Sequence, residues 1–189
     1  MKHSILIKCL GVFLILQAIH VSAAVVTHTG TVSSREVWSS DDTHVIDSSV
    51  TLAAGVELVI EAGAIVKFTG GAQLTINGAL NAEGAPGEEI IFTSITDDSV
   101  GGDTNGDGYS TGVPADWRHI VFNDAASDAL TVFSHVEVRF PGSGGQGIYI
   151  SGADITLDNV LVEESQGYGL FLTNSAAVIS NSTVRNNGN

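Results

Sequence analysis

Positive charge is scarce in this sequence. Its 189 residues include 7 Lys and Arg against 21 Asp and Glu, which gives a formal net charge of −14 at pH 7. Affinity for nucleic acid depends on neutralising several phosphates with cationic side chains. A strongly acidic surface also repels anionic membranes, and it repels polyanionic glycans unless cations bridge the two. We therefore expect neither nucleic acid nor an anionic membrane among the partners.

The only cysteine, Cys9, lies in the one long apolar run, residues 9–19. Lys2 and Lys8 precede this run and small residues follow it, an order typical of a secretory signal peptide. The run is too short to cross about 30 Å of hydrocarbon, which takes about 20 apolar residues. We predict a signal peptide at residues 1–23, and hence a secreted, extracellular or cell-surface protein.

Removal of the signal peptide leaves a chain without a thiol, which excludes disulfides and thiol catalysis. Lys2 and Lys8 leave with the signal while every acidic residue stays, so the formal charge becomes 5 − 21 = −16. No later stretch approaches a membrane-spanning length, so we expect no membrane insertion.

Two separate stretches of the sequence repeat with a period of 22 residues. Phe68 and Phe92 extend the first stretch at a spacing of 24, and Phe133 begins an earlier copy of the second. The pairs at the shorter spacing are Leu52 and Leu74, Leu58 and Leu80, Ile60 and Ala82, Leu157 and Ile179, Asn159 and Asn181, and Val162 and Val184.

Short segments of alternating apolar residues lie within these repeats and indicate strands with one buried face. They occupy residues 50–52, 74–76, 120–122 and 148–150. A unit of 22 residues cannot bury its apolar side alone, so consecutive units must stack about 4.8 Å apart with like residues over like. Leucine-rich repeats have similar periods, but their regular Leu and Asn consensus is missing. The pattern favours an all-β fold, a parallel β-helix.

The segment VTLAAGVELVIEAGAIVKF, residues 50–68, combines strands, glycine turns and a V-K-F strand. Residues 90–94 (IIFTS), followed by Asp116-Trp117 and residues 120–122, continue the pattern. The chain thereby resembles the right-handed parallel β-helix repeat proteins of bacteria, which share the pectate-lyase-like superfamily architecture. The resemblance implies a fold and not a reaction.

The expected organisation is a β-helix at residues 48–189 with an insertion loop at residues 94–117. Residues 24–47 would form an N-terminal cap, with Trp38 over the first coil. The chain stops inside a repeat without a capping helix, and an uncapped coil exposes strand edges. We expect a fragment or truncated product of a longer repeat protein, the alternative being that the C-terminal edge pairs with another chain.

Asn159 and Asn181 should lie at the same turn of successive coils, where side-chain amides can bond to one another. His135 takes that place one coil earlier. This arrangement indicates a structural ladder and not a site. Charged residues one period apart should likewise form an ion-pair ladder on an outer face: Arg139, Glu163 and Arg185.

Two aromatic residues, Tyr149 and Phe171, lie 22 positions apart between inward apolar residues. Both should therefore point outward, one above the other. Exposed aromatic groups often mark contact sites, so the pair predicts a sugar-stacking platform. The alternative is an aromatic stack that only shields the sheet.

The strongest local motif is DTNGDGY, which begins at Asp103. It reproduces the D-x-[DN]-x-[DN]-G core of a calcium loop, in which oxygen ligands at alternate positions surround a hard cation. Asp103, Asn105 and Asp107 would supply side-chain oxygens and Tyr109 a main-chain carbonyl, and Gly108 would let the loop close.

This core resembles calcium loops of the EF-hand and dockerin type, but Pro114 stands at the twelfth position, where a bidentate Glu is expected. We expect the missing carboxylate from Asp116, with Asp97 and Asp98 also within reach. The prediction is a weak Ca²⁺ site, with a dissociation constant of about 10⁻⁴ to 10⁻³ M. The alternative is a flexible loop that binds nothing specific.

Polysaccharide lyases and hydrolases share this fold. A lyase uses a strong base near a calcium-bound uronate, and a hydrolase uses two carboxylates about 5 to 9.5 Å apart. Arg139 and Arg185 are assigned to the ladder and Lys67 to an early strand, while Glu137 and Asp158 do not stand out from other acidic residues. We assign no catalytic residue.

The function that the sequence favours is a secreted or cell-surface, non-catalytic β-helix module within a larger protein. Adhesion or contact with polysaccharide and cell-surface glycans is the expected role. A lyase or glycoside hydrolase is one alternative, and a pure structural scaffold is the other.

Overall fold

The computed structural model describes residues 23–189, so the predicted signal peptide lies outside the described residues apart from Ala23. No helix among residues 23–189 has the length and apolar character needed to cross a membrane. The strands are β1 (Val25–Val32), β2 (Glu36–Trp38), β3 (Thr43–Leu52), β4 (Glu57–Ile60), β5 (Ile65–Phe68), β6 (Gln73–Ile76), β7 (Ala79–Glu83), β8 (Ile90–Ser94), β9 (Ile120–Asn123), β10 (Val132–Arg139), β11 (Gln146–Ser151), β12 (Thr156–Glu163), β13 (Tyr168–Thr173), β14 (Val178–Ser180) and β15 (Thr183–Arg185).

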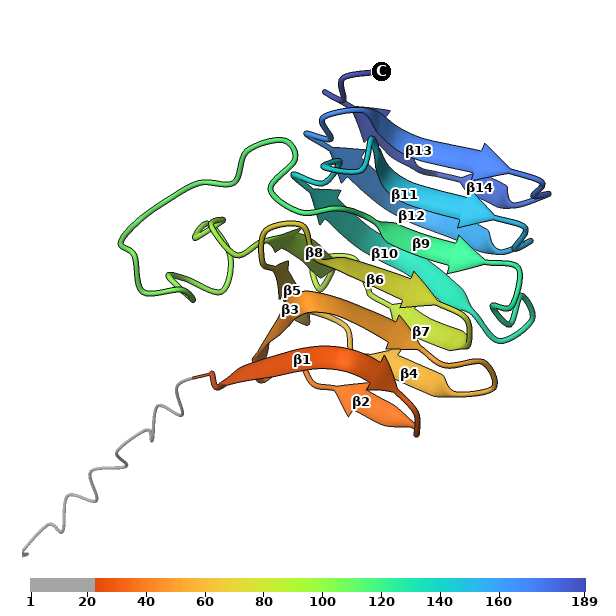
Figure 1. Ribbon diagram of the computed structural model, residues 1–189, viewed down its shortest axis with the longest axis horizontal. Helices are drawn as coiled ribbons and strands as arrows, with labels where there is room; N and C mark the ends of the chain where they lie inside the picture. Colours follow the sequence, from red (N-terminus) through yellow and green to blue (C-terminus); the bar gives the residue numbers. More distant parts are fainter. Residues whose placement is uncertain (1–22) are drawn as a thin grey trace, which may run out of the picture.

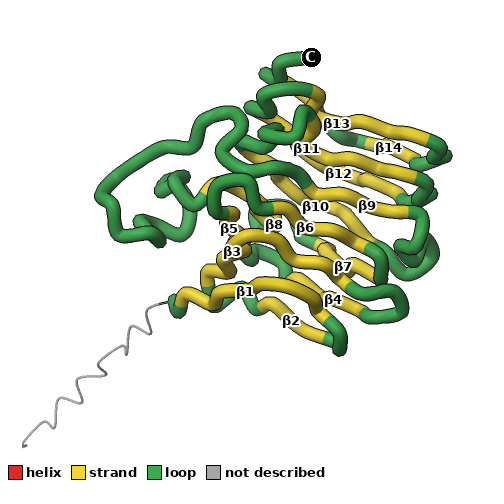
Figure 2. Tube along the Cα trace, in the orientation of Figure 1, coloured by secondary structure: helices red, strands yellow, loops and turns green. Residues whose placement is uncertain are grey.

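The strands stack in parallel as a solenoid of about 7 turns with a period of ~22 residues, which confirms the predicted parallel β-helix (Figures 1 and 2). The front sheet consists of β1, β3, β6, β9, β11 and β13. The back sheet consists of β2, β4, β7, β10, β12 and β14. The side sheet consists of β1, β3, β5, β8, β10, β12 and β15. The four strands named twice bend from one sheet into the next.

Three of these bends occur where a non-glycine residue adopts a positive φ: Ser48 (71°), His135 (49°) and Asn159 (53°). Asn and His tolerate this left-handed conformation better than most residues. The pairing of β12 with β14 and β15 places Asn181 over Asn159, which confirms their shared turn position. Both amides, however, donate to the Asp158 carboxylate at 2.7 Å. The expected bond between the two amides is therefore wrong.

The core consists of columns of apolar residues that point inward from each sheet. In the front sheet Val50, Leu74, Ile120, Ile148 and Leu170 follow one another from coil to coil. The first four are 0 % exposed. Burial of each such side chain contributes about 1.5–3 kcal/mol, so every coil depends on its neighbours for most of its stability.

One repeat pair that we predicted in the first stretch is wrong. Leu52 pairs with Ile76 and not with Leu74, so the local spacing is 24 residues. The spacing rises to 24 because four residues, 69–72, separate β5 from β6, whereas only residues 47 and 48 separate their register partners in β3. It returns to 22 because the turn after β3, residues 53–56, has two more residues than the turn after β6, residues 77–78. Because turns lie on the surface, they change length without disturbing the core.

The predicted pairing of Phe68 with Phe92 is also wrong, since Phe92 pairs with Val66. The spacing grows from 22 residues between Ile60 and Ala82 to 26 between Val66 and Phe92. Between Ala82 and Ile91 the chain therefore has four more residues than between their register partners Ile60 and Ile65, where we expected two. The rings of Phe68 and Phe92 still meet diagonally in the core, with centroids 6.3 Å apart.

Residues 24–47, where we expected a cap, form β1, β2 and the first part of β3, stacked in register as the outermost coil. Trp38 is 1 % exposed there. The insertion leaves the side sheet after β8 and returns to the front sheet at β9, and Figure 1 shows it projecting beyond the coils. Its return is anchored by Trp117, whose ring stacks on Phe68 at 3.9 Å and whose Nε1 donates to the Arg139 carbonyl at 2.8 Å.

Candidate functional site

The base of the insertion is fixed by two aspartates that directly follow β8. Thr93 donates to the Asp97 carboxylate at 2.7 Å, which ties this side chain to the end of the strand. The Asp98 Oδ2 atom accepts from the backbone N–H of Ser110 at 2.6 Å and from its hydroxyl at 3.2 Å. Asp98 therefore joins the outgoing and returning arms of the insertion.

The tip of the insertion folds around the Asp103 carboxylate. This carboxylate accepts hydrogen bonds from the backbone N–H groups of Gly106 (2.7 Å), Asp107 (3.2 Å) and Gly108 (3.0 Å). The two glycines have φ values of 74° and 91°, which residues with a side chain seldom adopt. The motif thus closes into a compact loop around the Asp103 carboxylate, while Asp103 and Asp107 both stay exposed.

Three carboxylates meet between the base and the tip of the insertion. One oxygen from each of Asp98, Asp103 and Asp107 lies within 4.8 Å of the others. Asp98 is 9 % exposed, and its Oδ1 atom has no hydrogen-bond partner among residues 23–189. We call this group the carboxylate cluster.

A buried lysine approaches the cluster from β5. Lys67 is 0 % exposed, and its Nζ donates to the Gly102 carbonyl at 2.7 Å. Burial lowers the pKa of Lys67, while the nearby Asp98, Asp97 and Asp103 act in the opposite direction. This contact could not be predicted from sequence, because residues 67 and 102 belong to different coils.

The other predicted metal ligands are placed differently. The Asn105 amide nitrogen donates to the Asp107 carboxylate at 2.8 Å. The Tyr109 residue is 82 % exposed. Asp116 accepts from the Thr96 hydroxyl (2.8 Å) and the Val113 backbone N–H (2.9 Å). Of the predicted set, the structure brings Asp103 and Asp107 together, and the third carboxylate beside them is Asp98 in place of Asp116.

A row of aromatic side chains lies on the outer face of the front sheet. Tyr149 and Phe171 are cross-strand neighbours, as we predicted, with ring centroids 5.6 Å apart. Tyr168 adds a third ring 5.2 Å from Phe171 and is 45 % exposed. His119 meets the other side of Tyr149 edge-on at 6.4 Å. We call Tyr149, Phe171 and Tyr168 the aromatic row.

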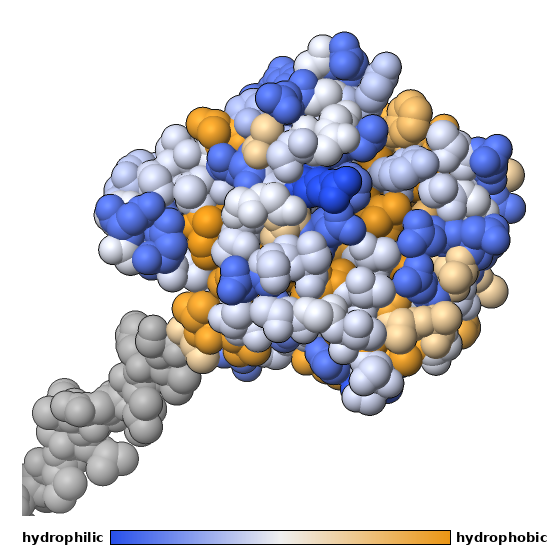
Figure 3. All heavy atoms as spheres, in the orientation of Figure 1, coloured by the Kyte–Doolittle hydropathy of each residue, from blue (hydrophilic) through white to orange (hydrophobic). Residues whose placement is uncertain are grey.

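Polar groups border the aromatic row. The Tyr149 hydroxyl and the Thr173 hydroxyl are 3.1 Å apart. His119 is 6 % exposed, and its Nδ1 has no hydrogen-bond partner within the described residues. Burial, followed by the positive charge of Arg118, lowers the pKa of His119 to about 4, so its imidazole is neutral near pH 7. The space-filling view shows apolar side chains reaching this front surface between hydrophilic ones (Figure 3).

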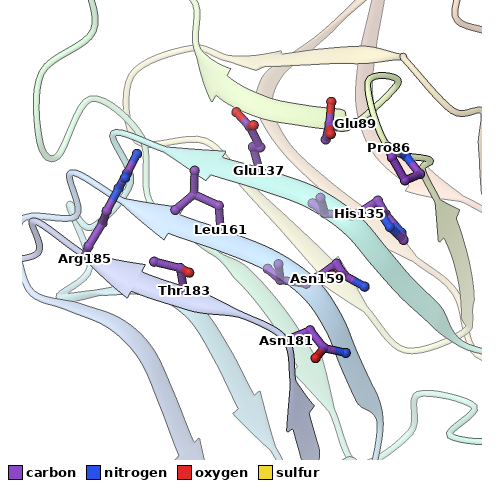
Figure 4. Close-up of a pocket in the computed structure, with 11 residues that line it drawn as sticks. Pro86, Glu89, His135, Glu137, Asn159, Leu161, Asn181, Thr183 and Arg185 are labelled. Atoms are coloured by element: carbon purple, nitrogen blue, oxygen red, sulfur yellow. The ribbon is translucent and has the colours of Figure 1, made fainter.

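A groove of about 420 Å³ runs along the side sheet, next to the bends of β10 and β12. Figure 4 shows a row of turn residues along one edge and charged residues on the wall. Hydrogen bonds from the backbone, chiefly the one from Gly87, lower the pKa of Glu89. The general acid of a glycosidase needs a raised pKa instead. The lining includes Glu89, His135, Glu137, Asn159, Asn181 and Arg185.

The predicted ion-pair ladder borders this groove and forms in part. Arg185 pairs with Glu163 at 2.9 Å. Arg139 is also a register partner of Glu163, but its Nε donates to Glu137 on its own strand at 3.0 Å. The charges around the groove are thus largely paired with one another.

No family model, curated protein or solved structure matches this chain. Function must therefore be inferred from the side chains that the solenoid displays. The aromatic row and the carboxylate cluster are the two arrangements with chemistry of their own.

Proposed function

We propose that this protein is an extracellular, non-catalytic β-solenoid module that contacts neutral polysaccharide through the aromatic row. The observation that carries the proposal is the stack of Tyr149 and Phe171 on adjacent strands, extended by the exposed Tyr168. The predicted signal peptide at residues 1–23 supports the extracellular assignment.

The flat outer face of a parallel sheet suits an extended ligand. Aromatic rings on successive coils present apolar faces in a row, and a sugar ring has an apolar face that can lie against them. The hydroxyls of Tyr149 and Thr173 stand beside these rings and can exchange hydrogen bonds with sugar hydroxyls. The row thus offers both the apolar and the polar contacts that a glycan needs.

The charge of the chain narrows the ligand class. A mature charge of −16 opposes the approach of uronate or sulfate polymers. The cross-strand neighbours of Tyr149 along the front sheet, Val121, Thr75 and Thr51, carry no charge. A neutral polysaccharide therefore fits this face better than an acidic one.

The test is retention of the protein, expressed from the complete sequence, on a panel of insoluble neutral polysaccharides. Replacing Tyr149 or Phe171 with Ala should weaken retention on the bound glycan about tenfold, equivalent to about 1.4 kcal/mol. Tyr149→Phe should keep most of the affinity, because the ring remains. Tyr109→Ala is the matched control, since this exposed tyrosine lies in the insertion away from the row, and it should have no effect.

Three results would replace this proposal. Equal retention of the Tyr149→Ala and Tyr109→Ala variants would mean that the row does not contact the glycan. Release of reducing or unsaturated ends by the unmodified protein would favour a hydrolase or a lyase. A lack of retention on every neutral polysaccharide would favour a scaffold.

A further inference from the structure

Asp98 is a buried acid with one unsatisfied oxygen. Its side chain lies at the start of the insertion with 9 % of the residue exposed. Ser110 supplies both hydrogen bonds to Oδ2, and no group in the described part of the chain donates to Oδ1. A buried carboxylate oxygen without a partner is unfavourable, so this atom is suited to a ligand that supplies positive charge.

Two further carboxylates face the same point, and this makes the need for positive charge greater. Asp103 and Asp107 each place an oxygen within 4.8 Å of the one from Asp98. Lys67 does not pair with any of them directly. The ion pairs within 4.0 Å among residues 23–189 do not include this lysine, and its ammonium group donates to the Gly102 carbonyl.

We infer that Asp98, Asp103 and Asp107 form a binding site for a divalent cation, with Ca²⁺ as the ion that fits best. Ca²⁺ takes oxygen ligands at about 2.3–2.6 Å, so two ligands on opposite sides of the ion are about 4.6–5.2 Å apart. The ligand oxygens of the cluster are at most 4.8 Å apart, so one ion of this size can contact all three carboxylates. Mg²⁺ requires shorter bonds and near-ideal octahedral geometry, which an irregular loop with three carboxylates does not favour.

Asn105 is the fourth side chain in reach. Its amide nitrogen now donates to Asp107, and a nitrogen that carries two hydrogens cannot ligate a cation. With the ion bound, the Asn105 amide turns so that its oxygen, in place of its nitrogen, faces the Asp107 carboxylate. Asn105 thereby joins the ligands, and water fills the remaining positions.

The ion would connect the base of the insertion to its tip. Asp98 is adjacent to β8, whereas Asp103 and Asp107 belong to the tip. Cation binding therefore fixes the tip against the body of the solenoid. This inference is independent of the glycan contact, because the cluster and the aromatic row share no residue.

The experiment is a calorimetric Ca²⁺ titration of the chelator-treated protein, with Asp98→Asn and Asp107→Asn as test variants. Asp116→Asn is the matched control, because Asp116 is in the same insertion but outside the cluster. We expect one saturable site with a dissociation constant of about 10⁻⁴ to 10⁻³ M. Each test variant should bind at least about tenfold more weakly, Asp116→Asn should be unchanged, and Mg²⁺ should bind more weakly than Ca²⁺.

Proteolysis gives a second readout that does not depend on the heat of binding. Ca²⁺ should slow cleavage between residues 99 and 109 in the wild type and in Asp116→Asn, and not in Asp98→Asn. Circular dichroism of each variant shows whether the solenoid is intact. Failure to saturate at 10 mM Ca²⁺, about ten times the weaker expected constant, would overturn the inference. Equal binding by Asp98→Asn, or equal loss in Asp116→Asn, would also do so.

Discussion

Trp117 should be the residue that holds the insertion to the core. Its indole is 0 % exposed, stacks on Phe68 with an interplanar angle of 9°, and donates to the Arg139 carbonyl. A buried Trp removes about 200 Å² from water, which at about 25 cal/mol per Å² is about 5 kcal/mol. Alanine keeps part of that area, so Trp117→Ala should cost about 4 kcal/mol. Trp117→Phe keeps the ring stack but loses the hydrogen bond and some area, and should cost about 2 kcal/mol.

The assay is urea unfolding followed by circular dichroism, since the midpoint and slope together give the free energy of unfolding. Val113→Ala is the control, because this side chain lies in the same insertion and is 55 % exposed. It should change stability by less than about 0.5 kcal/mol. If Trp117→Phe were no more destabilising than Val113→Ala, the hydrogen bond and the packing of the indole would not anchor the insertion.

Three other predictions concern pH, a turn and the surface. Burial lowers the pKa of His28 to about 4 and also lowers the pKa of His44, whereas unfolded His titrates near 6.5. The folded state binds fewer protons than the unfolded state in this interval, so the stability contributed by these histidines is full above about pH 6.5 and falls toward pH 4. The melting temperatures of the wild type and of His28→Gln should therefore converge as the pH is lowered over that range. Parallel curves of melting temperature against pH would contradict this. Gly78→Ala should destabilise by about 2 kcal/mol in urea, because a Cβ there would lie 2.3 and 2.4 Å from two backbone carbonyl oxygens. Arg185→Ala should cost less than about 1 kcal/mol in the same assay, because its pair with Glu163 is exposed, and a larger loss would show a packing role.

The coil period could be predicted from sequence because stacked coils need apolar residues over apolar residues. That constraint gave the register of Tyr149 with Phe171 and of Glu163 with Arg185. It did not constrain the turns, which face solvent. Leu52 was therefore assigned to the wrong partner. Residues 69–72 between β5 and β6 are two more than the bend of β3 on which they stack, and the turn after β3 is two residues longer than the turn after β6, so the two differences compensate.

The candidate site was less predictable. The D-x-N-x-D-G motif pointed to Asp103 and Asp107, but the choice among the neighbouring acids depends on how the insertion folds back on itself. Ser110 selects Asp98 through hydrogen bonds across twelve residues, for which a single sequence carries no pattern. Tyr168 was also missed. It lies an odd number of positions from Phe171, so strand alternation places the two on opposite faces although their rings meet.

The position of the insertion also has a consequence for how the chain folds. In a solenoid each coil folds onto the one before it, and short turns keep the entropy lost at each step small. Between β8 and β9 the chain must instead close a segment of 25 residues, 95–119, compared with the four residues 61–64 between β4 and β5. Closure of the longer segment costs about 1.6 kcal/mol more, from the logarithmic dependence on loop length. Refolding should therefore proceed in two blocks, one on each side of this junction, with the joining of the blocks as the slow step.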